Sequence, residues 1–342
     1  MRIVTNFARF PARWKAAPGL EGTSVPAAGV GQFLRHRGRG TVWLVNCDPG
    51  LTLRLAAVKA GAPWIGSRLV AADLVLRAPR PGMSRMAHPL RRLLLSKVDH
   101  FVHYFRDLTG YTREFGVSAE RSSFVPFKVN LHGRFAMAPD SEGEYILCLG
   151  RSMRDFDTFF DAMEQLPYPA AITRPAPDLM RQHGARFTRG LDALPSNVRI
   201  LEDDGSDEAM VRAVRGAKMV VLPILKTSLV ASGISTCLNA MSLGKCIIGS
   251  EGPGMLDVFE NGEVLAAPPE NAPALAAVMR RAWEDEELRK RTAMAGYQYA
   301  QQQGGEAELY RRLIDQVAYW YGRDESGEGK TSVHERNEKQ AF

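Results

Sequence analysis

The order of apolar runs in the second half of the chain constrains the fold more than any other feature. Short runs rich in Val, Ile, Leu, Ala and Cys alternate there with longer amphipathic segments. Strands that alternate with helices form a parallel, doubly wound sheet, so we expect a Rossmann-like domain with at least five strands. The expected strands are 145–150, 170–173, 198–201, 219–224 and 246–250. The expected helices are 157–166, 206–214, 232–244, one or two over 273–302, and 308–322.

The first half of the chain has the same pattern in a weaker form. Its strand candidates are rich in Val, Phe and Tyr and are bounded by Gly, Pro or Asp, and helical periodicity fills the gaps between them. A second parallel sheet is therefore expected here. The candidates are strands over 41–46, 68–76, 100–105 and 122–127, and helices over 51–60 and 88–98.

A linker is expected where Gly, Pro, Ser and acidic residues are mixed, over 131–144. The sequence thus predicts an N-terminal domain over 1–140 and a C-terminal domain over 141–322. Residues 323–342 have almost no apolar side chains and are expected to form a disordered tail. The predicted architecture is α/β, with two Rossmann-like domains facing each other across a cleft and the last helix returning to the first domain.

The two predicted domains differ in charge. Residues 1–142 carry 21 Lys and Arg against 9 Asp and Glu, a net charge of +12, whereas residues 143–342 carry 23 against 29, a net charge of −6. Domains of opposite sign indicate different partners. The basic domain is expected to face something anionic, such as a lipid surface or a phosphorylated acceptor, and no nucleic acid is expected as a partner.

The cysteines and the apolar runs bear on compartment and metal content. The four cysteines lie far apart and have no metal-ligand spacing, which favours reduced thiols and no zinc. The first twenty residues lack the apolar core of a signal peptide, and no run approaches about 18 apolar residues. These features favour a cytoplasmic protein.

The residues 220–265 contain the most informative motif. A strand-like run ends at Pro223, and after a loop a helix opens with small residues that leave N–H groups accessible. The dipole of the helix favours an anion at this end, so a diphosphate can bind there. The alternative is plain N-capping by Ser232 or Ser235. The residues at the opening are Ser232, Gly233, Ile234, Ser235 and Thr236.

The order of these motifs resembles the donor-binding half of glycosyltransferase family 4. The similarity begins at LGRSMRDFDTFFDAM (149–163), includes LNAMSLGK and GSEGPGMLDVFENGEVL, and extends to about residue 302. It implies the GT-B fold and an enzyme that moves a sugar from a nucleotide-sugar donor to an acceptor hydroxyl. The matching positions are Leu238, Ala240, Met241, Leu243, Gly244, Lys245, Gly252, Pro253, Gly254, Asp257, Asn261 and Gly262.

The resemblance also implies the chemistry and several residue roles. It implies retention of the anomeric configuration, no metal and no other cofactor, and a carbohydrate or lipid-linked acceptor. Arg151 and Arg154 take the catalytic positions that neutralise the donor diphosphate, and the alternative is a pair of solvated arginines. The helix opening would bind the donor.

Asp48 is the candidate for the acceptor side. It follows the strand over 41–46, and open α/β sheets bind ligands at the carboxyl ends of their strands. It could orient an acceptor hydroxyl, although Asp before Pro and Gly is often only a turn or helix-cap residue.

One departure from the family keeps other functions open. The alignment places Asn239 at the position of the Glu that binds the ribose, and Ala231 at the position of the Glu near the transferred sugar. Asn239 can still exchange hydrogen bonds with a ribose hydroxyl, whereas Ala231 offers no polar group. The alternatives are a non-catalytic nucleotide-sugar-binding relative and a sugar-nucleotide epimerase of the same fold.

A basic helix expected near residues 84–100 places Arg85, Arg91, Arg92 and Lys97 around four leucines. This pattern is typical of a helix that lies on anionic lipid, which predicts peripheral contact with the inner face of the membrane. A helix that covers a sheet has the same need for leucines.

Overall fold

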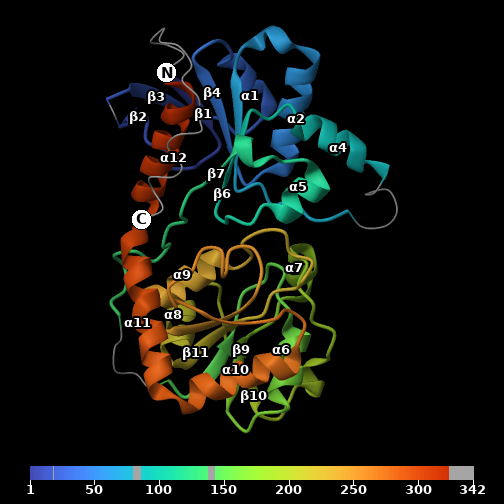
Figure 1. The fold of residues 1–342 in the computed structure, drawn as a ribbon, viewed down its shortest axis with the longest axis vertical. Coiled ribbons are helices and arrows are strands. Elements are labelled where there is room, and N and C mark those ends of the chain that lie inside the picture. The colour runs from blue at the N-terminus through green and yellow to red at the C-terminus, as the bar shows by residue number, and fades with distance from the viewer. Residues whose placement is uncertain (18, 80–85, 138–142, 323–342) are drawn as a thin grey trace.

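The computed structural model describes residues 1–17, 19–79, 86–137 and 143–322. Two α/β domains lie one above the other along the longest axis of the molecule (Figure 1). Each domain has its own sheet, with helices on both faces, as the two-domain Rossmann-like prediction requires. The expected fold class is confirmed. The predicted tail over 323–342 lies outside the described residues.

The N-terminal sheet has seven strands in the order β2-β3-β1-β4-β5-β6-β7. All neighbours are parallel except β2 and β3. The central strands are buried on both faces, which explains their uninterrupted apolar sequences. The strands are β1 (Arg2–Thr5), β2 (Arg13–Lys15), β3 (Glu21–Pro26), β4 (Thr41–Asn46), β5 (Arg68–Ala72), β6 (His100–His103) and β7 (Ser122–Phe124).

The helices of this domain connect the parallel strands. Asp48 begins α2, because its side chain accepts a hydrogen bond from the backbone N–H of Leu51 and Pro49 occupies the first turn. Gly116 ends α5 in the left-handed conformation. The helices are α1 (Val30–Arg35), α2 (Pro49–Gly61), α4 (His88–Leu95) and α5 (Thr109–Phe115), with short 3-10 turns at η1 (Pro63–Ile65) and η2 (Ala119–Arg121).

The C-terminal sheet has six parallel strands in the order β10-β9-β8-β11-β12-β13. Numbered within the domain this is 3-2-1-4-5-6, the order of a doubly wound sheet, whose ligand crevice lies where the order reverses. That point is between β8 and β11. The strands are β8 (Tyr145–Cys148), β9 (Ala170–Thr173), β10 (Val198–Leu201), β11 (Ala217–Leu222), β12 (Cys246–Ser250) and β13 (Leu265–Ala267).

The helices of this half of the chain fall close to their predicted ranges, except that α7 was not predicted. Four of them begin at a side-chain cap, for example Asp155 before α6 and Ser206 before α8. Of the one or two helices expected over 273–302, the structure has two, because Asp285 ends the first and caps the second. They are α6 (Phe156–Met163), α7 (Pro177–His183), α8 (Asp207–Arg215), α9 (Ile234–Ser242), α10 (Ala272–Glu284), α11 (Glu286–Gln303) and α12 (Glu306–Tyr321), with a 3-10 turn at η3 (Leu191–Ala193).

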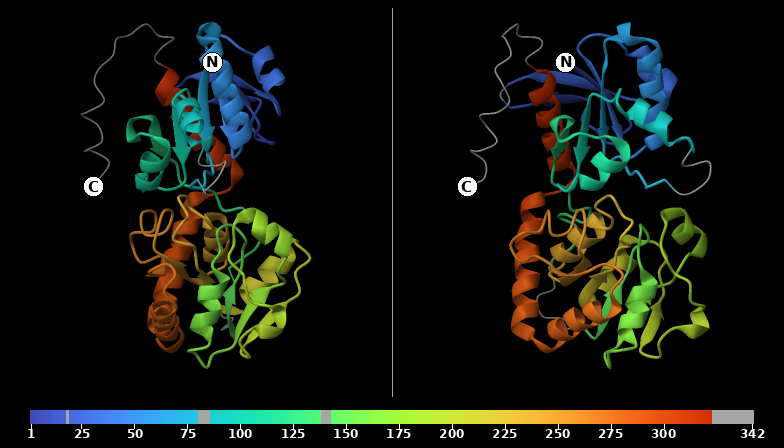
Figure 2. Two further views of the ribbon diagram at one scale, coloured as in Figure 1. Left: turned by 90° about the vertical axis from the view of Figure 1, so that its right-hand side faces the viewer. Right: turned by 45° about the vertical axis from the view of Figure 1, so that its right-hand side comes forward.

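The last helix crosses back to the first domain. Leu313 and Val317 of α12 are fully buried against Ile3 and Val42 of the N-terminal sheet. Figures 1 and 2 show α11 running up the C-terminal domain and α12 continuing along the N-terminal one. The predicted domain boundaries include α12 in the second domain, 141–322. As expected, however, this last helix returns to the first domain and packs on its sheet.

The basic helix α4 covers α2, and its leucines divide between the interior and the surface. Leu95 is buried, whereas Leu90 and Leu93 each have 58% of their surface exposed. The helix therefore both packs on the domain and presents apolar side chains outward; Arg85 lies outside the described residues. Within the described ranges, no helix combines the length and the apolar character needed to cross a bilayer.

Candidate active site

Two adjoining cavities lie at the carboxyl ends of the strands, where the domains meet. The larger, of about 410 Å³, lies in the C-terminal domain between the ends of β8, β9 and β10 and the start of α9. The smaller, of about 220 Å³, lies between the domains and shares the segment around Gly233 with the first. Both therefore lie at the ligand crevice that the strand order predicts. We call them the donor cavity and the cleft cavity.

The start of α9 presents free N–H groups to the donor cavity. Gly233 is the N-cap, with φ of 87°, and no side chain caps the helix. The backbone N–H groups of Ser235 and Thr236 have no protein acceptor among the described residues. Simple capping by Ser232 or Ser235 is thus not the role of these residues, and the helix end can bind an anion.

The other two residues of the helix opening, Ser232 and Ile234, line the cleft cavity and not the donor cavity. The hydroxyl of Ser232 is buried and lies 2.9 Å from the hydroxyl of Ser228. Ile234 is 9% exposed and packs in the core, and its N–H donates to the carbonyl oxygen of Ala231 at 3.2 Å. These residues shape the turn before α9, while Gly233, Ser235 and Thr236 line the donor cavity.

Arg154 lies beneath this helix end and is 1% exposed. Its Nε donates to the carbonyl oxygen of Leu149 at 2.8 Å, and its Nη1 is buried without a partner among the described residues. A Cβ on Gly233 would lie 2.9 Å from both Nη atoms, and a Cβ on Gly150 only 2.2 Å from Nη2. Two glycines with positive φ therefore make room for the guanidinium. Burial lowers the pKa of Arg154.

Arg151 lies at the surface of the donor cavity. It lines the cavity, is exposed, and has no ion-pair partner among the described residues, so its guanidinium is available to a ligand. The segment that carries both arginines is fixed by Asp155, which is fully buried. The Asp155 carboxylate accepts from the Thr158 N–H and hydroxyl and from the Arg186 guanidinium. The structure thus brings Arg151, Arg154 and the start of α9 together.

Asn239 lies one turn further along α9 and contacts the interdomain connection. Its Oδ1 accepts hydrogen bonds from the backbone N–H of Asn130 at 3.0 Å and of Leu131 at 3.3 Å. Asn239 is buried and does not line either cavity. This contact gives Asn239 a structural task that the sequence does not reveal, and its contact with the donor ribose stays a prediction.

We expect Asn239→Leu to lower the free energy of unfolding by about 1–3 kcal/mol, because two backbone N–H groups lose their acceptor and that of Leu131 is buried. Nucleotide affinity should change little if the linker contact is the main role of Asn239. Urea unfolding and calorimetry of the same variant measure the two effects. If the variant is as stable as the wild type but binds the nucleotide more weakly, the result would instead support contact of Asn239 with the donor ribose.

The N-terminal wall of the cleft cavity contains two residues that the sequence pattern did not single out. Cys47 and Asp73 follow β4 and β5 and have positive φ angles of 51° and 48°. A non-glycine residue in this region costs about 1–2 kcal/mol, and such strain gathers at functional sites. Both side chains line the cleft cavity. Asp48, the predicted residue, instead directs its carboxylate to the cap of α2 and does not line the cavity.

Burial raises the pKa of Asp73 from 3.8 to about 6. Because the folded protein disfavours the charged carboxylate, Asp73 lowers the stability as the pH rises from about 4 through about 6, and its effect is constant above that range. We therefore expect Asp73→Asn to raise the melting temperature more at about pH 8 than at about pH 4.5. Thermal unfolding at both pH values measures this, and an equal shift at both would contradict it.

The loop after β12 joins the two domains. Asp257 is half-buried; its Oδ1 accepts from the N–H of Gly254 and Met255, and its Oδ2 accepts from the N–H of Arg106 and Asp107 in the N-terminal domain. A Cβ on Gly254 would lie 2.1 Å from the Cβ of Ala231. The loop thus packs directly on Ala231, and a larger side chain there would displace it.

Within the described residues, no group of three or more His, Cys, Asp or Glu side chains is arranged to hold a metal ion.

Comparison with known proteins relates the C-terminal domain to a known family. Residues 193–299 match the family model described as glycosyl transferases group 1. The chain has the GT-B fold, and its C-terminal domain contains a region of the glycosyl transferases group 1 type. The match covers β10 to α11 and includes the start of α9, so it agrees with the resemblance to family 4. A sequence search of curated proteins finds no match.

Solved structures show the same fold at low identity. A sucrose-phosphate synthase from Thermosynechococcus elongatus is 14% identical, with a TM-score of 0.62, and 94% of this chain and 89% of that chain are covered. HepE from Anabaena, solved with UDP and glucose, is 13% identical, with a TM-score of 0.61 and coverage of 81% and 78%. A trehalose-phosphate synthase from Burkholderia xenovorans, in complex with glucose-6-phosphate, is 12% identical, with a TM-score of 0.59 and coverage of 84% and 75%.

Proposed function

We propose that this glycosyltransferase moves a sugar from a nucleoside-diphosphate sugar to an acceptor hydroxyl, with retention and without a metal ion or other cofactor. The observation that carries the proposal is the meeting of Arg151, Arg154 and the free N–H groups of α9 at one cavity. Similar structures hold UDP, or UDP and glucose, which supports a donor of this class.

In the proposed reaction, the donor diphosphate lies at the start of α9. When the bond between the anomeric carbon and the phosphate oxygen breaks, its electron pair stays on that oxygen. Arg151 and the helix N–H groups stabilise the added charge. The acceptor oxygen then bonds to the anomeric carbon on the same face, and its proton passes to a phosphate oxygen of the leaving nucleotide.

The acceptor, a carbohydrate or a lipid-linked sugar, would enter the cleft cavity opposite the donor. Asp73 is the carboxylate that lines this cavity. Since its pKa lies near 6, Asp73 is ionised at neutral pH and can accept a hydrogen bond from an acceptor hydroxyl. Asp73 therefore takes the orienting role that the sequence suggested for Asp48, whose carboxylate caps α2.

The exposed side of α4 supports a peripheral contact with an anionic membrane at its inner face. Leu90 and Leu93 are exposed beside Arg91 and Arg92, so apolar insertion and charge attraction act on the same helix. Such a contact would place the N-terminal domain close to a lipid-linked acceptor.

A second candidate is a non-catalytic nucleotide-sugar-binding protein. Ala231 lies where the family has a Glu, and the Gly254 loop packs against it, so no polar group from this position can contact the sugar. The two candidates differ in the fate of the donor after it binds. UDP-, GDP- and ADP-sugars should each be tested for binding, for hydrolysis and for transfer to an added acceptor. Binding without hydrolysis or transfer would favour the second candidate, and an altered sugar on intact nucleotide would indicate an epimerase.

We expect Arg151→Ala to weaken binding of the preferred nucleoside diphosphate by about 1.5–3 kcal/mol, the range for a charge-assisted hydrogen bond. The fold should be unaffected because Arg151 is exposed. Calorimetry measures the affinity. Arg281→Ala, an exposed arginine on α10 away from the cleft, is the matched control. Equal affinities of the two variants would remove Arg151 from the site.

A further inference from the structure

A large basin lies at the opposite end of the N-terminal domain from the cleft. It has a volume of about 1230 Å³ and is bordered by the amino ends of β4, β5, β6 and β7 and by the end of α12. The carboxyl ends of β4 and β5 line the cleft cavity, so the basin and the active site are separated by the length of the sheet. The proposed reaction uses none of its residues.

The basin is lined by five cationic side chains and one carboxylate. Each cation comes from a different segment that leads into a strand or ends the preceding helix, so the fold brings them together from distant parts of the sequence. Like charges in a concavity with protein walls produce a strong positive potential. The cations are Arg39, Lys59, Arg68, Lys97 and Arg121, and the carboxylate is Asp99.

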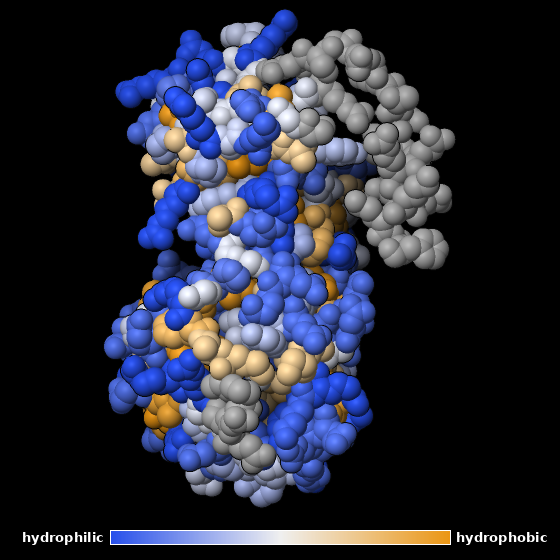
Figure 3. All heavy atoms as spheres, turned by 90° about the vertical axis from the view of Figure 1, so that its left-hand side faces the viewer, coloured by the Kyte–Doolittle hydropathy of each residue, from blue (hydrophilic) through white to orange (hydrophobic). Residues whose placement is uncertain are grey.

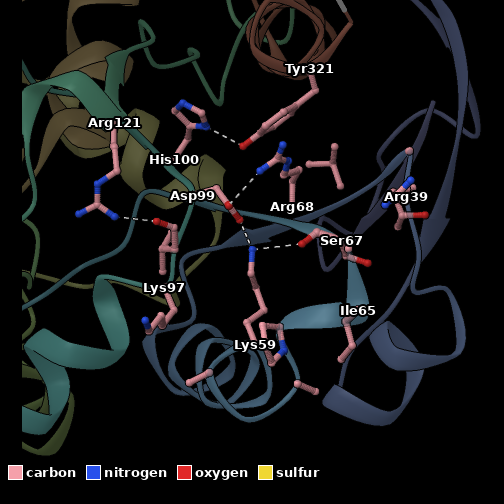
Figure 4. A pocket seen from close by; sticks show the side chains of 18 of the residues that line it. Arg39, Lys59, Ile65, Ser67, Arg68, Lys97, Asp99, His100, Arg121 and Tyr321 are labelled. Carbon is pink, nitrogen blue, oxygen red and sulfur yellow. Dashed lines mark hydrogen bonds and ion pairs between the residues drawn. The ribbon is translucent and has the colours of Figure 1, made fainter. Parts of the chain in front are cut away.

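Asp99 can balance only part of this charge. It accepts hydrogen bonds from Lys59 and from the backbone N–H of Leu69, and its Oδ1 lies 3.7 Å from Arg68 (Figure 4). These contacts fix Lys59 and Arg68 in the centre of the basin. The remaining charge must be balanced by solvent or by a ligand.

The other three cations have no carboxylate partner within the described ranges. Arg39 and Lys97 are exposed, and Arg121 donates to the carbonyl oxygen of Val98 at 2.8 Å, which holds its guanidinium at the edge of the basin. The sheet does not need Arg39 and Lys97 for its packing, since both side chains are exposed. Both side chains are therefore available to a ligand, with Lys97 on the same side of Asp99 as Arg121 and Arg39 on the opposite side (Figure 4).

The aromatic side of the basin is also fixed. Tyr321 of α12 lines it, and its hydroxyl lies 2.6 Å from Nδ1 of His100, which stacks on Trp320 with ring centroids 4.2 Å apart. Figure 3 shows the face with α12, where hydrophilic side chains project from the N-terminal domain. At another edge Trp64, which is 80% exposed, stands between Pro63 and Ile65 of the basin wall.

We infer that this basin is a second anion site, which binds a phosphate-bearing molecule through Arg39, Lys97 and Arg121. Guanidinium and ammonium groups from separate segments suit phosphate oxygens. The phosphate belongs either to a soluble phosphorylated compound or to an anionic lipid headgroup, and the exposed Trp64 at the rim suits the second source. The inference does not depend on the proposed transfer, because it concerns residues outside the cleft.

The test uses inorganic pyrophosphate as the soluble probe. Arg151→Ala serves as the background, because it weakens the donor cavity and leaves the basin intact. In this background we expect Arg39→Ala combined with Lys97→Ala to weaken pyrophosphate binding in calorimetry by about tenfold or more, since two charge-assisted contacts are lost. Both side chains are exposed, so the variant should fold. Arg281→Ala in the same background is the control.

The second arm uses vesicles of phosphatidylcholine with and without phosphatidylglycerol. If the ligand is a lipid headgroup, the basin variant should lose salt-sensitive binding to the anionic vesicles. Leu90→Ser with Leu93→Ser tests the separate contact of α4. If the basin variant loses only pyrophosphate binding, the ligand of the basin is a soluble phosphorylated compound. If it also loses binding to anionic vesicles, the ligand is a lipid headgroup. If the basin variant binds both probes as its control does, the inference is overturned.

Discussion

Replacing Arg154 with Met is expected to stabilise the ligand-free protein and to remove nucleotide binding at the same time. Arg154 is 1% exposed and makes one hydrogen bond through Nε, while its Nη1 has no partner among the described residues. It also lies against the positive end of the α9 dipole. A bound diphosphate would balance both charges. The unliganded fold therefore carries an electrostatic strain that binding relieves.

The expected magnitudes come from buried charges in other proteins. An apolar side chain of similar volume in place of a buried, poorly paired ion often stabilises a fold by about 1–4 kcal/mol. Loss of one partner of a buried charge pair weakens binding by about 2–5 kcal/mol. Melting curves without ligand and calorimetry with the preferred nucleoside diphosphate measure the two effects. If Arg154 were only a structural residue, the substitution would not raise the melting temperature while it weakens nucleotide binding.

The control for this prediction is Arg281→Met, which should change neither quantity beyond a few tenths of a kcal/mol, since Arg281 is exposed. If Arg154→Met proves less stable than the wild type, then the bond to the Leu149 carbonyl outweighs the burial of the charge. Arg154 would then support the fold rather than the ligand.

The second large effect is expected for Asp257→Ala. The carboxylate joins the Gly254 turn to the backbone of Arg106 and Asp107 in the other domain. Loss of charge-assisted bonds worth about 1.5–3 kcal/mol should reduce the population of the docked arrangement by about 10–100-fold. We expect a larger radius of gyration in small-angle scattering and slower sugar transfer. Nucleotide affinity should persist, because the donor cavity belongs to the C-terminal domain.

Asp285→Ala is the matched control, since that carboxylate also accepts a backbone N–H but only within α11. It should lose helix-cap stability of about 1 kcal/mol and leave the scattering curve unchanged. An unchanged scattering curve for Asp257→Ala would show that α12 and the linker alone hold the domains in place.

Most of the C-terminal domain was predictable because its strands are short apolar runs with polar boundaries. The expected ranges 170–173, 198–201 and 246–250 coincide with β9, β10 and β12. By contrast, β1 and β3 were missed. β1 contains only two apolar residues, Ile3 and Val4, which is too short a run to stand out, and β3 mixes Gly, Thr, Ser and Glu because no residue in it is fully buried.

The candidate site was predictable only where local sequence determines it. Small residues and the resemblance pointed to the start of α9 and to Arg151 and Arg154, and the structure brings these groups together. Asp73 was not predicted as a site residue because the run RLVAADLVL has the pattern of one continuous strand. In the structure the backbone of this run turns at Asp73. The link from Asn239 to Asn130 spans 109 residues and leaves no local signal.

The packing of α12 has a consequence for how the molecule folds during synthesis. The N-terminal sheet is translated first, yet one face of its core stays uncovered until Leu313, Val317 and Tyr321 have left the ribosome. The first domain therefore cannot reach its final stability as an independent folding unit, and the C-terminal domain must fold while its partner is still incomplete. A nascent chain that stops before α12 would expose a strip of buried Ile, Val and Leu, which is a surface that chaperones bind and that favours aggregation.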